Sequence, residues 1–102
     1  VKFIYVNAAL FVHVPNAFSP NGDLINDQFG LGGITQGVTN FNMKVYNRWG
    51  ELVFATDDVN NKWDGTYIGS VVEQGVYVYM IQFANAKKTQ WYYYNGEVNL
   101  LR

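Results

Sequence analysis

The ten residues VPNAFSPNGD, Val14–Asp23, carry more structural information than any other part of the chain. They contain both prolines of the protein, an Asn-Gly-Asp turn sequence and one aromatic side chain, Phe18. Proline fixes φ and has no N–H to donate to a sheet, so this stretch cannot be the middle of a central strand. It is predicted to be an extended edge segment that turns sharply at Pro20-Asn21-Gly22.

The composition of the 102-residue chain predicts one domain, 1–102, in which residues 1–13 form a first strand or the tail of a preceding segment. Hydrophobic residues make up 49% of the chain and aromatic residues 18%, so a core can form. The net charge of -1 argues against nucleic acid as a partner. The longest apolar run, Ala8–Val12, is much shorter than the roughly 20 residues of a membrane-spanning helix. The chain begins with Val1 rather than Met, which suggests a fragment of a larger protein.

Short apolar stretches rich in β-branched and aromatic residues alternate with turn residues along the whole chain. Strands are predicted at Lys2–Val6, Leu10–Val14, Gln28–Leu31, Phe41–Tyr46, Leu52–Ala55, Val76–Ala84 and Gln90–Leu101. Turns are predicted at Asn21-Gly22-Asp23, Gly32-Gly33, Asn47–Gly50, Asn60-Asn61, Asp64-Gly65 and Asn85-Ala86. About seven short strands at this spacing predict an all-β fold, an antiparallel β-sandwich.

Two of these strands allow further predictions. Val76–Ala84 is apolar on both faces, so it is expected in the middle of a sheet with both faces covered. Asn95-Gly96 would suit a small hairpin between Trp91–Tyr94 and Glu97–Leu100. We favour one long strand with a bulge at Gly96, because two four-residue arms are only marginally stable in water.

No residue pattern predicts an enzyme. Cysteine is absent, which excludes disulfides and thiolate catalysis. His13 is the only histidine, so it has no second His or Cys with which to build a metal site or a catalytic dyad. Neither Ser19 nor Ser70 has a histidine in a triad motif, and no paired-carboxylate or phosphate-loop pattern occurs.

Two sets of residues suggest ligands, each with a structural alternative. Asn21, Asp23, Asn26 and Asp27 would suit a Ca²⁺ ion. However, Ile25 interrupts the EF-hand pattern, and these side chains more often cap their own turns. The aromatic residues Trp91–Tyr94 alternate faces on a strand, so two should be exposed, either to stack on sugar rings or to cover the flank of a sheet.

Two further motifs are predicted to be corners of the fold. In Trp63-Asp64-Gly65, glycine takes the positive φ that a turn after Asp requires. In Asn47-Arg48-Trp49-Gly50, the arginine can also stack on the tryptophan ring. A structural role is favoured for both motifs.

Several motifs together, in a fixed order from Val14 to Arg102, identify a family. The residues that carry the resemblance are Pro15, Asn16, Phe18, Pro20 and Gly22, then Asn26-Asp27 and Phe29, Tyr46-Asn47-Arg48-Trp49-Gly50, Val53-Phe54, Trp63-Asp64-Gly65, Gly69, Gly75-Val76-Tyr77-Val78-Tyr79 and Gly96–Arg102. This pattern resembles the gliding motility-associated C-terminal domain, the type B sorting domain of the Bacteroidetes type IX secretion system. The chain departs from that pattern at Leu24, where Gly is usual, and at Val72-Glu73-Gln74, which replaces Leu-Pro.

The resemblance implies an immunoglobulin-like sandwich that directs a large N-terminal passenger, after periplasmic transit, to the cell surface or medium. It implies recognition by type IX outer-membrane proteins of the SprF/PorP type and no cofactor. The implied recognition residues are Gly96, Glu97, Val98, Asn99, Leu100, Leu101 and Arg102. A terminal strand would leave edge groups free for strand addition by a partner. The alternative function is a carbohydrate-binding or adhesive module.

Overall fold

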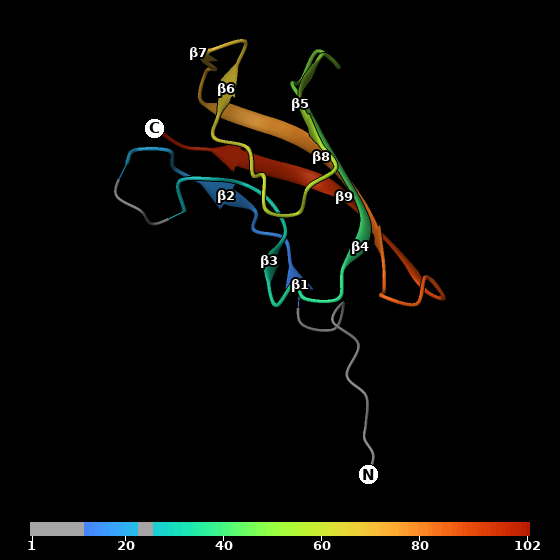
Figure 1. The fold of residues 1–102 in the computed structure, drawn as a ribbon. Helices are drawn as coiled ribbons and strands as arrows, with labels where there is room; N and C mark the ends of the chain where they lie inside the picture. The colour runs from blue at the N-terminus through green and yellow to red at the C-terminus, as the bar shows by residue number, and fades with distance from the viewer. Residues whose placement is uncertain (1–11, 23–25) are drawn as a thin grey trace.

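The computed structural model describes residues 12–22 and 26–102, and every regular element in these ranges is a β-strand (Figure 1). The strands are β1 Val12–His13, β2 Ala17–Phe18, β3 Gly32–Gly33, β4 Thr39–Tyr46, β5 Leu52–Thr56, β6 Thr66–Tyr67, β7 Ser70–Val71, β8 Gly75–Ala84 and β9 Trp91–Leu100. The all-β prediction is confirmed, with several two-residue strands that were not expected. The predicted strand Lys2–Val6 lies outside the described residues.

The main sheet has the strand order β2-β9-β8-β4-β5. Strands β9, β8, β4 and β5 are antiparallel neighbours, whereas β2 pairs parallel with the end of β9. The sheet is therefore mostly antiparallel, as predicted, with one parallel pair at its edge. Pro15 and Pro20 bracket β2, and because neither has an N–H, the pairing is confined to two residues at the sheet edge. The predicted edge position of this segment is confirmed.

The core lies on one face of the main sheet, and connecting segments cover it. Phe29, Leu31 and Trp63 lie outside that sheet and are fully buried. Phe29 and Trp63 exchange two backbone hydrogen bonds of 2.8 Å. The Trp63 ring lies 5.1 Å from that of Tyr77, and Phe29 lies 5.3 Å from Tyr79. The second layer of the sandwich thus consists of these segments and the short pairs β1–β3 and β6–β7.

Two predictions around this layer are wrong. The predicted strand Gln28–Leu31 is reduced to the single bridge between Phe29 and Trp63, and the predicted turn at Gly32-Gly33 is strand β3. β3 pairs with β1, and the His13 ring lies directly over Gly32. A Cβ atom on residue 32 would lie 2.5 Å from His13 Cε1, so any larger residue there would force the His13 ring to move.

The central strand β8 has one buried and one open face. Tyr77, Ile81 and Phe83 are buried, but Val76, Val78 and Met80 are 41%, 40% and 52% exposed. The mid-sheet position is confirmed, and the expectation that both faces are covered is wrong for the described residues. The reason is that the second layer packs on the opposite face of the sheet.

The end of the chain forms one continuous strand. The register of β8 with β9 runs without a shift from the Gly75–Leu100 pair to the Ala84–Trp91 pair. Neither a hairpin nor a bulge occurs at Gly96, so only the long-strand part of the prediction is confirmed. Gly96 lies opposite Tyr79, and a Cβ at this position would lie 3.0 Å from the Tyr79 hydroxyl oxygen. The glycine therefore makes room for a cross-strand aromatic ring.

Candidate functional site at the terminal end of the sandwich

The last residues of β9 alternate between the core and the surface. Val98 and Leu100 are fully buried, whereas Glu97, Asn99 and Leu101 are exposed. Of the residues predicted for recognition, Val98 and Leu100 cannot present their side chains to a partner in the folded domain. Any recognition by side chains here must use Glu97, Asn99, Leu101 or Arg102.

The backbone edge of this segment is occupied by the chain that contains β2. The N–H of Asn99 donates to the carbonyl oxygen of Asn16, and the N–H of Leu101 donates to that of Phe18, both at 2.9 Å. The free terminal edge expected from the sequence is therefore not present at these residues. A partner that pairs with Asn99 or Leu101 by strand addition would first have to displace β2.

Arg102 ties the end of the chain to the segment before β8. Its Nη2 atom donates to the carbonyl oxygens of Val72 at 2.8 Å and Gly65 at 3.2 Å, and its Nε atom donates to Val72 at 3.1 Å. Its backbone N–H donates to Gln74 Oε1 at 2.9 Å. A planar guanidinium group carries several N–H donors, so it can donate to two carbonyl oxygens at the same time.

The turn after β4 displays a tryptophan. The side-chain oxygen Oδ1 of Asn47 accepts hydrogen bonds of 2.9 Å from the N–H groups of Trp49 and Glu51, and Gly50 has a φ of 83°. Asn47 and Gly50 thus account for the turn. They do not account for Trp49, whose side chain is 79% exposed with Arg48 Cζ 5.3 Å from its ring centroid.

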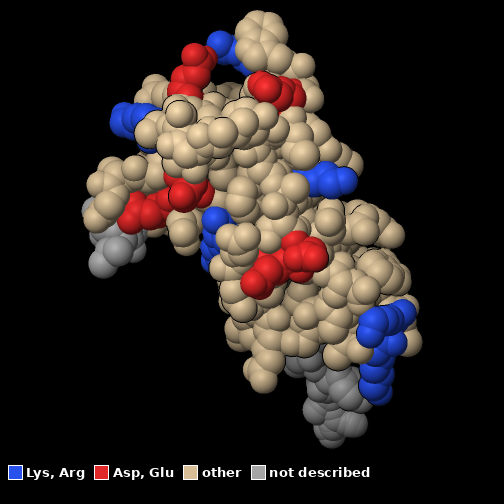
Figure 2. Space-filling view, turned by 45° about the horizontal axis from the view of Figure 1, so that its top comes forward, with Lys and Arg blue, Asp and Glu red and all other residues tan. Residues whose placement is uncertain are grey.

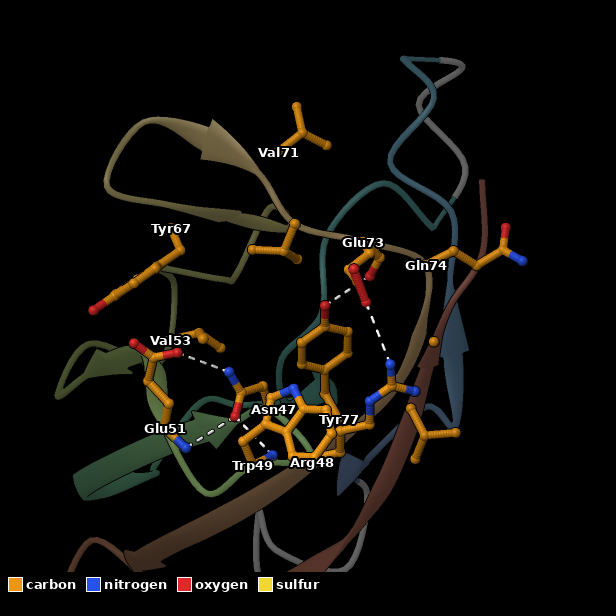
Figure 3. A pocket seen from close by; sticks show the side chains of 13 residues that line it. Asn47, Arg48, Trp49, Glu51, Val53, Tyr67, Val71, Glu73, Gln74 and Tyr77 are labelled. Atoms are coloured by element: carbon orange, nitrogen blue, oxygen red, sulfur yellow. Dashed lines mark hydrogen bonds and ion pairs between the residues drawn. The ribbon is translucent and has the colours of Figure 1, made fainter.

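A hollow of about 300 Å³ separates this turn from the segment Val71–Tyr77 (Figure 3). Arg48 Nη2 lies 3.5 Å from Glu73 Oε1 across it, and both side chains are exposed. The Tyr77 hydroxyl donates to the carbonyl oxygen of Glu73 at 2.6 Å. Burial, followed by the nearby Glu73 carboxylate, raises the pKa of Tyr77 above its ordinary value, because both disfavour the phenolate.

The Trp63-Asp64-Gly65 motif forms a corner that packs against the end of β9. Trp63 is fully buried and its Nε1 donates to the carbonyl oxygen of Thr66 at 2.9 Å. Asp64 Oδ1 accepts hydrogen bonds from the Thr66 N–H at 3.1 Å and the Thr66 hydroxyl at 2.7 Å. Gly65 has a φ of 84°, and a Cβ there would lie 3.2 Å from Leu100 Cδ1, so glycine lets the terminal strand pack against the corner.

The predicted calcium residues form a self-capped turn in the part that is described. Asp27 Oδ1 accepts hydrogen bonds from the N–H groups of Asn21 at 3.1 Å and Gly22 at 3.0 Å. Asn26 has a φ of 54°, a conformation that asparagine tolerates. Asp23 lies outside the described residues. Of the two candidate carboxylates, only that of Asp27 lies in the described residues, and one of its oxygens supports the turn. Calcium binding stays a prediction.

The aromatic run on β9 divides between the two faces as predicted. Trp91 and Tyr93 are 39% and 69% exposed. Tyr92 and Tyr94 are half-buried, with their rings 5.2 Å and 5.9 Å from that of Phe83. Packing against Phe83 explains the positions of Tyr92 and Tyr94. The exposed rings of Trp91 and Tyr93 lie on the open face of the sheet.

The sequence of residues 12–98 matches the family described as the CHU_C type IX secretion signal domain. The chain belongs to this family. As a CHU_C domain it is a C-terminal sorting signal for type IX secretion, which directs export to the cell surface or medium. This membership does not favour the carbohydrate-binding alternative.

A solved structure shares the fold of this CHU_C domain. The similar chain is PorZ, described as an essential bacterial surface component of the type-IX secretion system of Porphyromonas gingivalis. The match has a TM-score of 0.54 and 20% sequence identity, and it covers 93% of this chain and 12% of PorZ. At this identity the likeness shows the fold alone, which is consistent with an immunoglobulin-like sandwich. No curated protein matches the sequence of this CHU_C domain.

Sequence reasoning missed one part of this end of the CHU_C domain, the hairpin β6–β7. The strands have two residues each and join through Ile68-Gly69. Gly69 was the only signal, because isoleucine is not a usual turn residue. Residues 12–22 and 26–102 contain no helix long and apolar enough to cross a bilayer.

Proposed function

We propose that the folded domain is recognised in the periplasm by outer-membrane proteins of the SprF/PorP type, through the exposed side chains of Gly96–Arg102. The domain itself performs no catalysis, and its passenger lies N-terminal in the same chain. Membership of the CHU_C family supports the secretion role. The residue-level assignment comes from the resemblance described above and from the exposure of this segment.

The observation that carries the proposal is the fixed backbone from which the terminal side chains project. Asn99 and Leu101 are fixed by backbone bonds to the β2 segment, and Arg102 is fixed to Val72 and Gly65. A backbone that is already held in one geometry loses little conformational entropy when a partner binds. Recognition through side chains also leaves the pairing of β2 with β9 intact.

Non-catalytic function is supported by the position of the one histidine. His13 lies on β1 with its ring over Gly32, where it takes part in the β1–β3 contact. Burial raises the pKa of both Tyr77 and Tyr79. A raised tyrosine pKa keeps the hydroxyl protonated at neutral pH, which does not activate it as a base or nucleophile.

The test is a secretion assay with the complete chain fused to an inert periplasmic reporter in cells that have type IX secretion. The variant Glu97→Ala/Asn99→Ala/Leu101→Ala changes only exposed side chains of the terminal segment. The matched control, Gln82→Ala/Tyr93→Ala/Asn95→Ala, changes three exposed side chains elsewhere on β8 and β9. We expect the first variant to lower secretion at least tenfold and to lose co-purification with the outer-membrane partner. Secretion equal to the unmodified fusion would contradict the assignment.

A further inference from the structure

The tip of the β6–β7 hairpin holds a residue in an unfavourable conformation. Tyr67 pairs with Ser70, so Ile68 and Gly69 form a two-residue loop, with φ angles of 51° and 77°. Two positive φ values in such a loop define a type I′ turn, which favours Asn, Asp or Gly at its first position. Among the described residues with positive φ, Ile68 is the only β-branched one. A β-branched residue in this region is a genuine outlier, because its Cβ crowds the backbone.

Ile68 is also exposed to solvent. Its side chain is 85% accessible, the largest value among the exposed large hydrophobic residues of the described chain. The folded domain therefore gains neither backbone relaxation nor burial from isoleucine at this position. Strained residues that persist without a packing role are characteristic of binding sites.

Two further exposed apolar side chains line the hollow beside the β6–β7 hairpin. Val71 on β7 is 65% exposed and lines the hollow beside the Asn47 turn. Trp49, 79% exposed, lines the opposite side of the same hollow (Figure 3). Tryptophan and arginine are the residues most enriched at the energetic centres of protein interfaces, and Arg48 lies beside Trp49.

The charges at this end favour a protein partner over a lipid surface. Arg48 is paired with Glu73, and Glu51 follows in the same turn. Figure 2 brings this end forward and shows separate Lys/Arg and Asp/Glu groups rather than one cationic patch. Binding to anionic bilayers relies on clustered basic residues around the apolar ones.

We propose that Ile68, Val71 and Trp49 form a docking surface for a folded protein partner, which takes Ile68 and Trp49 into apolar pockets. The surface is distinct from the Gly96–Arg102 segment, and the two lie at the same end of the domain because Arg102 bonds to Val72. The assignment of the partner to the export machinery rests on the proposed function. The existence of the docking surface does not.

The central test uses one substitution with opposite effects on stability and binding. Ile68→Asn places a residue suited to the type I′ turn at the hairpin tip, so the Tm should rise by about 4–8 °C. Export of the reporter fusion should nevertheless fall at least tenfold. The control Ile34→Asn makes the same change at a residue that is 57% exposed and lies between β3 and β4, and export should be unchanged. Export of the Ile68→Asn fusion at the unmodified level would overturn the proposal.

A second readout separates this proposal from the sorting function. A photo-crosslinking amino acid replaces Val71 or, as a control, Ile34, in the complete chain inside cells with type IX secretion. We expect an outer-membrane secretion protein to be cross-linked from position 71 only, and Ile68→Asn to abolish the adduct. If the unmodified fusion is not exported, the sorting function is contradicted. The docking surface is contradicted separately, if position 71 gives no cross-link to an outer-membrane secretion protein. The proposal would also be overturned if the domain sediments with phosphatidylethanolamine–phosphatidylglycerol vesicles and Ile68→Asn abolishes this sedimentation. That result would show a membrane-binding site.

Discussion

Arg102 reaches back across the surface to Val72, and its Nε and Nη2 atoms both donate to the same carbonyl oxygen, at 3.1 and 2.8 Å. This contact joins the end of the terminal strand to the segment that enters β8. Val72 also lines the hollow beside the Asn47 turn, together with Tyr67 and Val71 of the β6–β7 hairpin, so these parts lie close to the terminal residues.

Removal of this guanidinium should destabilise the domain. Arg102→Ala loses three side-chain hydrogen bonds, and because the group is exposed we expect a cost of about 1 kcal/mol in the free energy of unfolding. Arg102→Lys should recover little of this, because an ammonium group cannot span the two carbonyl oxygens in the same way. Urea unfolding of the three proteins measures the difference, and equal midpoints would contradict the role of this contact.

Two neighbouring leucines should differ sharply in their effect on stability. Leu100 is fully buried, so Leu100→Ala should cost about 2–5 kcal/mol in the free energy of unfolding. Leu101 is 47% exposed, and Leu101→Ala should change it by no more than about 0.5 kcal/mol. Thermal and urea unfolding provide the measurement. A deletion of Gly96–Arg102 removes Leu100 and Val98 from the core, so substitutions are better tests of recognition than truncation.

The close approach of Gly96 to Tyr79 predicts a coupled pair. Gly96→Ala places a Cβ 3.0 Å from the Tyr79 hydroxyl oxygen, and we expect a loss of about 1–3 kcal/mol from overpacking. Tyr79→Phe removes that oxygen. The double variant should therefore lose less free energy of unfolding than the two single variants lose in total. A double-mutant cycle measures the coupling, and purely additive energies would show that the two side chains do not compete for space.

Two tyrosines should make the domain sensitive to alkali. Burial raises the pKa of Tyr77 and of Tyr79, so the folded chain keeps protons that the unfolded chain loses above about pH 10. Stability is therefore unaffected by these groups below that pH and falls as the pH rises toward the folded-state pKa values. Tyr77→Phe should start about 1 kcal/mol less stable, through loss of the Glu73 hydrogen bond, but decline less steeply. Tm measured from pH 8 to 11.5 tests this, and parallel curves would exclude Tyr77 as a source of the decline.

The long strands could be predicted from the sequence because their side chains alternate or are continuously apolar over several residues. β4, β5, β8 and β9 begin and end within two residues of the predicted bounds. The hydrophobic pattern could not reveal that one face of β8 is open, since the covering layer comes from connecting segments. β3 was predicted as a turn, because two consecutive glycines usually mark a turn, and its pairing with β1 joins residues that are far apart in sequence.

The candidate site was predictable only in part. The resemblance located the terminal segment, but alternation alone could not show that β2 covers its edge, because that contact joins residues far apart in sequence. Trp49 was correctly expected at a corner. Its exposure could not be predicted, because it depends on the direction in which the turn points relative to the rest of the fold. Ile68 gave no signal, since nothing in a short Thr-Tyr-Ile-Gly-Ser stretch indicates an isoleucine with positive φ.

The pairing of β2 with β9 has a consequence for biosynthesis. Phe18 and Leu100 come from opposite ends of the described chain, yet they are register partners in one sheet and both are fully buried. A nascent polypeptide that stops before β9 lacks the strand that joins β2 to β8. The five-stranded sheet of the sorting signal can therefore assemble only after β9 has been translated, because β2 has no other partner in that sheet among the described residues.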